Sequence, residues 1–147
     1  IVTGCTMMVN RSLLDLVTEI PKHAVMHDMW LALVAAAFGE IGFVDRATML
    51  YRQHGQNANG AKNVKTLRYL LWKLCCGQEI HQNLLKQYLQ SGEFLEFYYL
   101  RLSCEQKEML RTYSLFDKKT IIEKVIALRK FQLYKKGFVR VMGQLLR

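Results

Sequence analysis

Hydrophobic positions in the first third of the chain occur in short runs that predict several small elements. Residues 5–9 form an apolar run with β-branched members, which predicts a buried strand. A brief helical turn is expected over residues 10–17, and Pro21 separates it from the next helix. Residues 28–38 are apolar at nearly every position, so we predict a helix that is buried on almost all sides and ends at Gly39.

Two further short strands are predicted over residues 41–44 and 47–51, on either side of a turn at 45–46. The segment after them, residues 55–62, is rich in Gly, Asn and Gln, which predicts a loop. This loop is the best candidate for a boundary between a first part, residues 1–60, and a second part, residues 61–147.

The second part has apolar residues at helical spacing almost throughout. The expected helices cover residues 62–76, 78–90, 93–103, 105–114 and 120–136, with joints at Gly77, 91–92, 103–104 and 116–117. We therefore predict a fold that is mainly α with a few short strands, in which an all-helical extension follows the first part.

The composition is that of a globular chain. Its 147 residues are 51% hydrophobic with one proline, which is enough to bury a core. The longest uninterrupted apolar run, residues 29–38, is ten residues long, about half of a membrane span. No signal-peptide pattern is visible, and a start at Ile1 suggests a piece of a longer protein.

The four cysteines have apolar neighbours and a spacing that fits neither a zinc site nor a disulfide framework. We expect reduced thiols that are buried in the core, and hence a cytoplasmic protein. The four are Cys5, Cys75, Cys76 and Cys104.

Positive charge is concentrated at the end of the chain. Residues 118–147 hold nine Lys or Arg and one acid, for +8, whereas residues 1–117 hold twelve basic and eleven acidic residues, for +1. Residues 131–147 combine aromatic, aliphatic and basic side chains at helical spacing, which suits an anionic membrane surface. The alternative is a helix docked on its own domain with a solvated basic face. No nucleic-acid motif accompanies the charge, so no nucleic-acid partner is expected.

Two polar clusters carry the candidate chemistry. Residues 26–30 (Met-His-Asp-Met-Trp) open the apolar helix, and residues 51–57 (Tyr-Arg-Gln-His-Gly-Gln-Asn) follow a predicted strand. Each places titratable side chains at the end of an element, where rigid scaffolds expose catalytic groups. Together with residues 3–14, which begin Thr-Gly-Cys-Thr-Met-Met, they resemble the second half of the catalytic domain of glycosyltransferase family 2. The likeness is in particular to bacterial rhamnosyltransferases that build cell-surface polysaccharide.

The resemblance implies an inverting hexosyltransferase of the GT-A fold. The expected donor is a nucleotide sugar, dTDP-rhamnose, and the expected acceptor is a glycan or a lipid-linked sugar. Asp28 would be the base that takes the proton from the acceptor hydroxyl. The resemblance also implies a divalent cation, Mn²⁺ or Mg²⁺, with His54 as a ligand. The substrate-binding residues would be Gly4, Cys5, His27, Arg52 and Asn57.

These residues also have a structural interpretation. Asp28 is a favoured N-cap for the helix that it opens, although Leu31 three positions later provides no capping box. The other candidates could equally be ordinary strand-entry, strand-end, loop and turn residues. The rival hypothesis is therefore a non-catalytic basic helical module that binds a membrane surface or a protein partner.

The resemblance does not include the nucleotide-binding half of the family's catalytic domain, because no Asp-x-Asp motif occurs in the 147 residues. We therefore expect residues 1–60 to be the C-terminal remnant of a GT-A α/β catalytic domain, and this chain alone to be inactive and to bind no cation. A second copy, giving a homo-oligomer, or the helical extension would cover the sheet edge that is left. The expected location is the cytoplasm, with peripheral attachment to the inner face of the plasma membrane.

Overall fold

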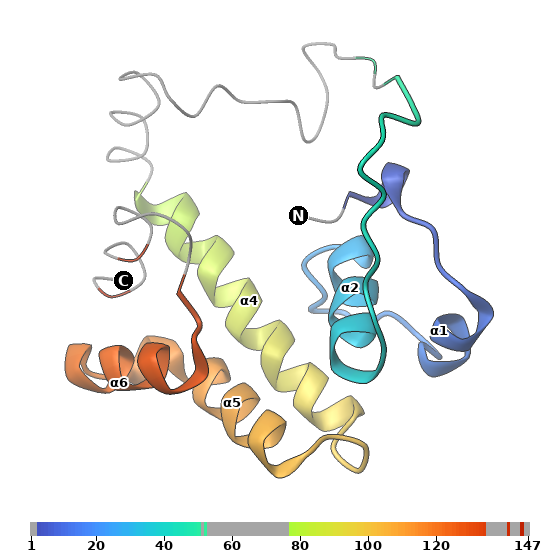
Figure 1. The fold of residues 1–147 in the computed structure, drawn as a ribbon. Coiled ribbons are helices and arrows are strands. Elements are labelled where there is room, and N and C mark those ends of the chain that lie inside the picture. Colours follow the sequence, from blue (N-terminus) through green and yellow to red (C-terminus); the bar gives the residue numbers. More distant parts are fainter. Residues whose placement is uncertain (1–2, 51, 53–76, 135–140, 142–144, 146–147) are drawn as a thin grey trace.

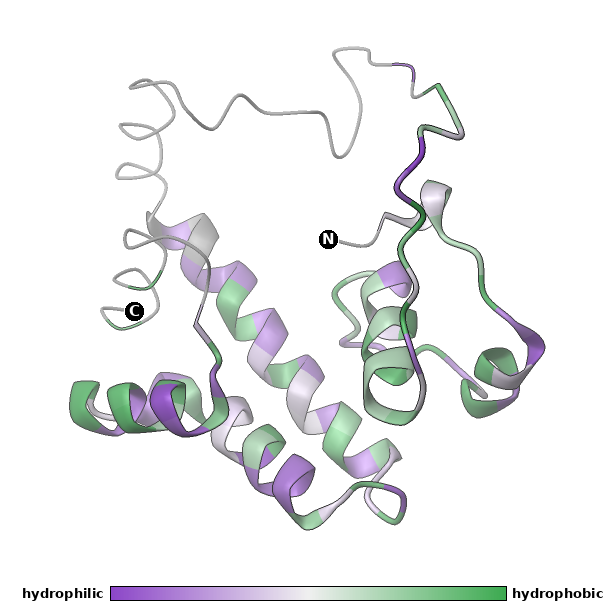
Figure 2. Ribbon diagram, viewed as in Figure 1, coloured by the Kyte–Doolittle hydropathy of each residue, from purple (hydrophilic) through white to green (hydrophobic). Residues whose placement is uncertain are grey.

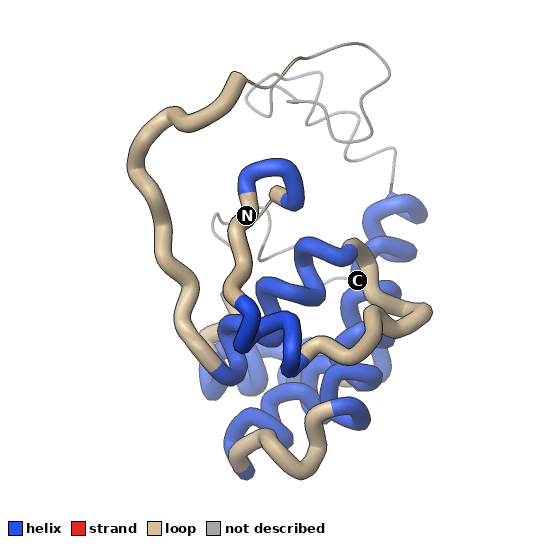
Figure 3. The backbone as a smooth tube through the Cα atoms, turned by 90° about the vertical axis from the view of Figure 1, so that its right-hand side faces the viewer, coloured by secondary structure: helices blue, strands red, loops and turns tan. Residues whose placement is uncertain are grey.

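The computed structural model describes residues 3–50, 52, 77–134, 141 and 145 (Figure 1). Its α-helices are α1 (Arg11–Leu16), α2 (His27–Phe38), α4 (Gly77–Phe97), α5 (Cys104–Ser114) and α6 (Ile121–Phe131). Two short 3-10 helices, η1 (Gly4–Thr6) and η2 (Phe116–Lys118), also lie within the described residues. No strand occurs among these residues (Figure 3), so the prediction of a mainly α fold is confirmed for this part of the chain.

The predicted strand over residues 5–9 is wrong. Residues 4–6 form η1 instead, in which the Thr3 carbonyl accepts hydrogen bonds from the Thr6 N–H at 2.9 Å and the Thr6 hydroxyl at 3.0 Å. A short β-branched run becomes a strand only when a neighbouring strand pairs with it. Within the described residues, nothing pairs with this run.

The strand predicted over residues 41–44 is also wrong, and the described residues of the second, 47–50, form no strand either. Residues 39–50 run as an irregular exposed segment from the end of α2 past η1 (Figure 3). The apolar side chains of this segment, Ile41, Phe43, Val44, Met49 and Leu50, are all exposed. The sequence pattern favoured strands here, but the described part of the chain contains no sheet for them to join.

Helix α2 begins one residue earlier than predicted. Its N-cap is Met26, which provides no side-chain hydrogen bond, so Asp28 is the second helical residue rather than the cap. The predicted end at Gly39 is confirmed, with the Gly39 N–H donating to the Ala35 carbonyl at 2.9 Å. Most of α2 is apolar apart from its beginning (Figure 2).

The prediction that α2 is buried on almost all sides is wrong. The buried residues of α2 are Asp28, Trp30 and Val34, whereas Leu33 and Ala36 on the other side are exposed. Alanine occupies three successive positions of this helix, and its small side chain leaves little apolar area to bury.

Helix α4 is continuous where two helices with a joint at residues 91–92 were predicted. The Ser91 hydroxyl donates to the Gln87 carbonyl at 2.8 Å, one turn back, so the serine is accommodated within the helix. Gly92 faces the Ser114 side chain, where an added Cβ would meet its Cβ at an ordinary 3.7 Å. A single glycine costs a helix about 1 kcal/mol, which packing along both ends of α4 outweighs.

One hydrophobic cluster joins the first part of the chain to α4. Trp30 and Val34 of α2 pack with Phe94, Tyr98 and Leu102, and partly buried residues of α1 contact them. The Trp30 and Phe94 rings meet edge to face, with centroids 5.2 Å apart. Residues on both sides of position 60 therefore share one core, and the division of the chain at that point stays a prediction.

A second cluster covers the opposite side of α4. Leu84 and Tyr88 of α4 pack with Phe116 of η2 and with Ala127 and Leu128 of α6. Helix α4 thus lies between α1 and α2 on one side and α6 on the other (Figure 1). No helix within the described ranges is both long and apolar enough to cross a bilayer.

Helices α5 and α6 begin with capping boxes. The Ser103 hydroxyl accepts from the Gln106 N–H at 3.2 Å while Gln106 Oε1 accepts from the Ser103 N–H at 2.9 Å, and Thr120 and Glu123 repeat the arrangement at α6. Helix α6 ends at Phe131, five residues before the predicted end, because Gln132 has φ 52°. This left-handed conformation stops a helix.

Candidate functional site

The carboxylate of Asp28 joins two sequence motifs that lie 24 residues apart. Its Oδ2 accepts a hydrogen bond from the Gly4 N–H at 2.9 Å, and its Oδ1 accepts one from the Met29 N–H at 2.8 Å. The side chain is almost completely enclosed, with 3% of the residue exposed. Asp28 therefore fixes η1 against the first turn of α2.

The first turn of α2 accounts for this placement. A helix begins with N–H groups that have no partner within it, and the Met26 side chain does not accept from them. Asp28 accepts a hydrogen bond from one of these N–H groups, and its charge lies where the helix dipole is positive. The second oxygen of the same carboxylate holds the chain segment at Gly4.

Gly4 lies close to the imidazole of His27. A Cβ at position 4 would come within 2.9 Å of His27 Nε2 and 3.6 Å of the Asp28 Cβ, so only glycine fits without moving the histidine. The His27 side chain is exposed. The structure thus brings together three of the predicted site residues, Gly4, His27 and Asp28, with Asp28 enclosed and His27 open to solvent.

Cys5 follows Gly4 in η1 and is exposed. Cys104, at the start of α5, is exposed too, so the expectation of buried thiols is wrong for both. The reason for Cys5 is that η1 replaces the buried strand and buries none of its residues. Cys75 and Cys76 lie outside the described residues.

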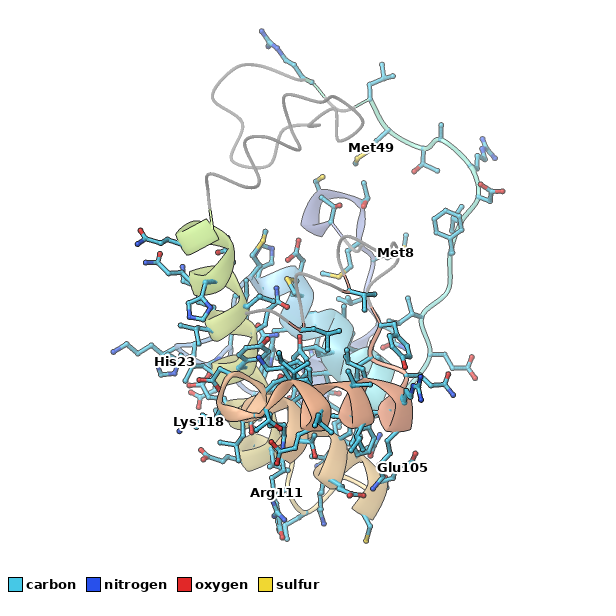
Figure 4. All side chains as sticks on the ribbon, turned by 90° about the vertical axis from the view of Figure 1, so that its left-hand side faces the viewer. Met8, His23, Met49, Glu105, Arg111 and Lys118 are labelled. Atoms are coloured by element: carbon cyan, nitrogen blue, oxygen red, sulfur yellow. The ribbon has the colours of Figure 1, made fainter. Side chains whose placement is uncertain are left out.

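The second polar cluster is only partly described. The Arg52 side chain is exposed. The chain leading to it has left the helices by residue 49, as Figure 4 shows for Met49. His54 and Asn57 lie outside the described residues, so the roles assigned to them stay predictions.

A divalent cation does not fit the described residues of this site. Asp28 is a single carboxylate whose oxygens each accept a hydrogen bond from a backbone N–H group, whereas a hard divalent cation takes six or more oxygen ligands. Across the described ranges, no three His, Cys, Asp or Glu side chains gather in a way that could hold a metal ion. No chemical step is therefore assigned to a cation here.

Sequence reasoning missed the contacts that hold the loop before α2. The His23 N–H donates to Glu93 Oε2 at 3.1 Å, and the Val25 N–H donates to Gln90 Oε1 at 2.6 Å. Gln90 and Glu93 are three residues apart on α4, so they share a face of that helix. The signal in the sequence was weak, because neighbouring positions on this face, Lys86, Gln87 and Glu96, are polar too.

The arrangement can hold a carboxylate rigidly beside an exposed imidazole. The loop at residues 23–25 is attached to α4, α2 follows it directly, and α2 in turn carries Asp28 and His27. The rigidity of the site thus comes from the helical part of the chain. No protein-family model matches this chain, and neither a curated protein nor a solved structure matches it.

Proposed function

We propose that this chain is the acceptor-side, C-terminal part of an inverting glycosyltransferase that uses a nucleotide sugar, with Asp28 as its general base. The donor would be dTDP-rhamnose, and the product a cell-surface polysaccharide or its lipid-linked precursor. The observation that carries the proposal is the hydrogen bond from the Gly4 N–H to Asp28. Two motifs of the resemblance, far apart in sequence, meet at the residue that the chemistry requires.

The base would act at the carboxylate. The acceptor hydroxyl oxygen attacks the anomeric carbon of the donor, the bond from that carbon to the nucleoside diphosphate breaks, and the hydroxyl proton passes to Asp28. Each carboxylate oxygen has two lone pairs, and the two backbone N–H groups occupy one on each. One lone pair on each oxygen remains for the proton.

His27 supports an acceptor site next to the carboxylate. Its imidazole lies against Gly4 and next to Asp28 in the chain, and it is accessible to solvent. A sugar hydroxyl that hydrogen-bonds to His27 would be held close to the base, which is the positioning that such transfers need. The nucleotide and the cation, Mn²⁺ or Mg²⁺, would be bound by residues of a longer parent protein.

The burial of Asp28 favours a second candidate function. An acceptor can reach a carboxylate that is 3% exposed only if the neighbouring side chains move aside. If they do not, Asp28 only fastens η1 to α2, and the chain is a non-catalytic basic helical module. The two functions predict different results when the Asp28 charge is removed: turnover falls if Asp28 is the base and stays the same if it is only structural.

The test compares Asp28→Asn with Asp15→Asn in the full-length parent, by sugar transfer from dTDP-rhamnose and by thermal unfolding. Asp15 is exposed on α1 and pairs with Arg11, so it serves as the matched control. We expect Asp28→Asn to lower turnover at least ~100-fold at temperatures where the variant is folded. His27→Ala should raise KM for the acceptor more than it lowers kcat.

The outcome that would contradict the base role is equally clear. The amide that replaces the carboxylate in Asp28→Asn keeps one acceptor oxygen, so one of the two backbone hydrogen bonds is lost and the melting temperature falls in either case. Turnover close to that of the control, together with the lower melting temperature, would show that Asp28 is a structural brace.

A further inference from the structure

Helix α6 has its hydrophobic and charged residues in unusual places. Ile122 and Ile126 are 73% and 59% exposed, whereas Lys124, on the opposite side of the helix, is buried. The ammonium group of Lys124 lies 5.7 Å from the centre of the Phe116 ring, within the second cluster. We name these two exposed isoleucines the isoleucine face.

The isoleucine face points away from the protein core. Ala127 and Leu128 are the apolar residues that attach α6 to α4, and they lie on the other side of the helix. Ile122 and Ile126 are four residues apart and therefore neighbours on one side of it. Single exposed apolar residues are normal on a surface; two adjacent isoleucines beside exposed basic residues are a candidate contact surface.

Two exposed basic residues flank the isoleucine face in the sequence. Lys118 precedes α6, and Arg129 lies three residues after Ile126 on the same side; both side chains are exposed. Figure 4 shows Lys118 at the periphery of the helices. The one acid of α6, Glu123, is held by its capping box, where its Oε2 accepts from the Thr120 N–H at 2.8 Å and the Thr120 hydroxyl at 2.7 Å.

We propose that the isoleucine face of α6 docks on an anionic lipid bilayer. Aliphatic side chains on a convex helix suit the boundary between headgroups and acyl chains, and the basic residues beside them complement anionic headgroups. A protein partner would instead have to provide a groove for the helix, and such interfaces favour aromatic residues. This inference does not depend on sugar transfer.

The experiment is co-sedimentation of the full chain with vesicles of phosphatidylcholine containing phosphatidylserine, and with vesicles of phosphatidylcholine alone. We expect binding to the anionic vesicles only, and release as the Debye length falls to ~3 Å near 1 M salt. Ile122→Ser with Ile126→Ser should lower the bound fraction about tenfold. The matched control is Leu89→Ser with Leu100→Ser, which removes two exposed leucines outside α6 and should bind like the unaltered chain.

A second pair of variants tests the charge independently of the isoleucines. Lys118→Gln with Arg129→Gln should weaken binding to anionic vesicles and leave the circular dichroism spectrum unchanged, because both side chains are exposed. Equal binding by the isoleucine variant and by its leucine control would overturn the proposal. So would retention of the chain by a soluble acidic polypeptide but not by the anionic vesicles, since that points to a protein partner.

Discussion

His23 and Glu93, 70 residues apart, join the loop before α2 to α4. The imidazole Nδ1 of His23 lies 2.5 Å from Glu93 Oε1, and the backbone N–H of His23 donates to the other carboxylate oxygen. The histidine side chain is half exposed and the glutamate is one-fifth exposed. One carboxylate thus binds both the side chain and the backbone of a single residue.

We expect Glu93→Ala to lower the free energy of unfolding by about 1 kcal/mol, because a partly exposed pair and one backbone hydrogen bond are lost. Glu96→Ala, one turn further along α4, removes an exposed carboxylate and is the control. Urea denaturation followed by tryptophan fluorescence measures both. Equal midpoints for the two variants would mean that the contact contributes nothing.

Gly4→Ala should displace His27 rather than disturb the backbone. The clash at 2.9 Å is with the end of the imidazole, which can turn away toward solvent. We expect a loss of stability below about 1 kcal/mol in the natural chain. In a His27→Ala background the same change should be neutral or stabilising by about 0.5 kcal/mol, because alanine restricts the unfolded chain. A double-mutant cycle with no coupling between the two positions would rule out the contact.

Stability should fall at alkaline pH through Tyr88. Burial raises the pKa of Tyr88 to about 12, with smaller contributions from Tyr113 and Asp117, whereas its ordinary value is 10.0. The folded protein therefore favours the neutral phenol. Its contribution is complete below pH 10.0 and is lost as the pH rises to about 12.

Tyr88→Phe keeps the aromatic packing against Phe116 and removes the titration. Measured from pH 9 to pH 12 (~3 units), the unfolding midpoint of this variant should fall less steeply than that of the natural chain. Tyr134→Phe, at an exposed tyrosine outside the cluster, is the control and should change nothing. Identical profiles for Tyr88→Phe and the natural chain would contradict the assignment.

Self-association should depend on residues 41–50. Phe43 and Val44 are exposed in an irregular segment, and exposed apolar residues of this kind promote contacts between copies. We expect Phe43→Ser with Val44→Ser to shift sedimentation toward the monomer at a given concentration. The expected homo-oligomer would be ruled out by a natural chain that sediments as a monomer up to the highest soluble concentration.

Local signals predicted where α2, α5 and α6 begin, whereas the continuity of α4 and the absence of strands from the described residues depend on contacts between distant residues. Ser103 and Thr120 are capping residues whose partners lie three positions away, so the starts of α5 and α6 could be predicted to within one residue. The strand over residues 41–44 depended on a partner that no local pattern can reveal. The same holds for the site, because spacing alone gives no reason for Gly4 to meet Asp28.

The left-handed residue that ends α6 has a consequence for the basic end of the chain. At Gln132 the backbone turns, and the Leu133 N–H donates to the Leu128 carbonyl at 3.2 Å. Leu133 then packs against the second cluster. The helical repeat of α6 therefore stops at Gln132. The side of α6 on which its isoleucines lie cannot be inferred from the spacing of residues after position 132. A glycine at position 132 would preserve this break at lower conformational cost, whereas a β-branched residue there would oppose it.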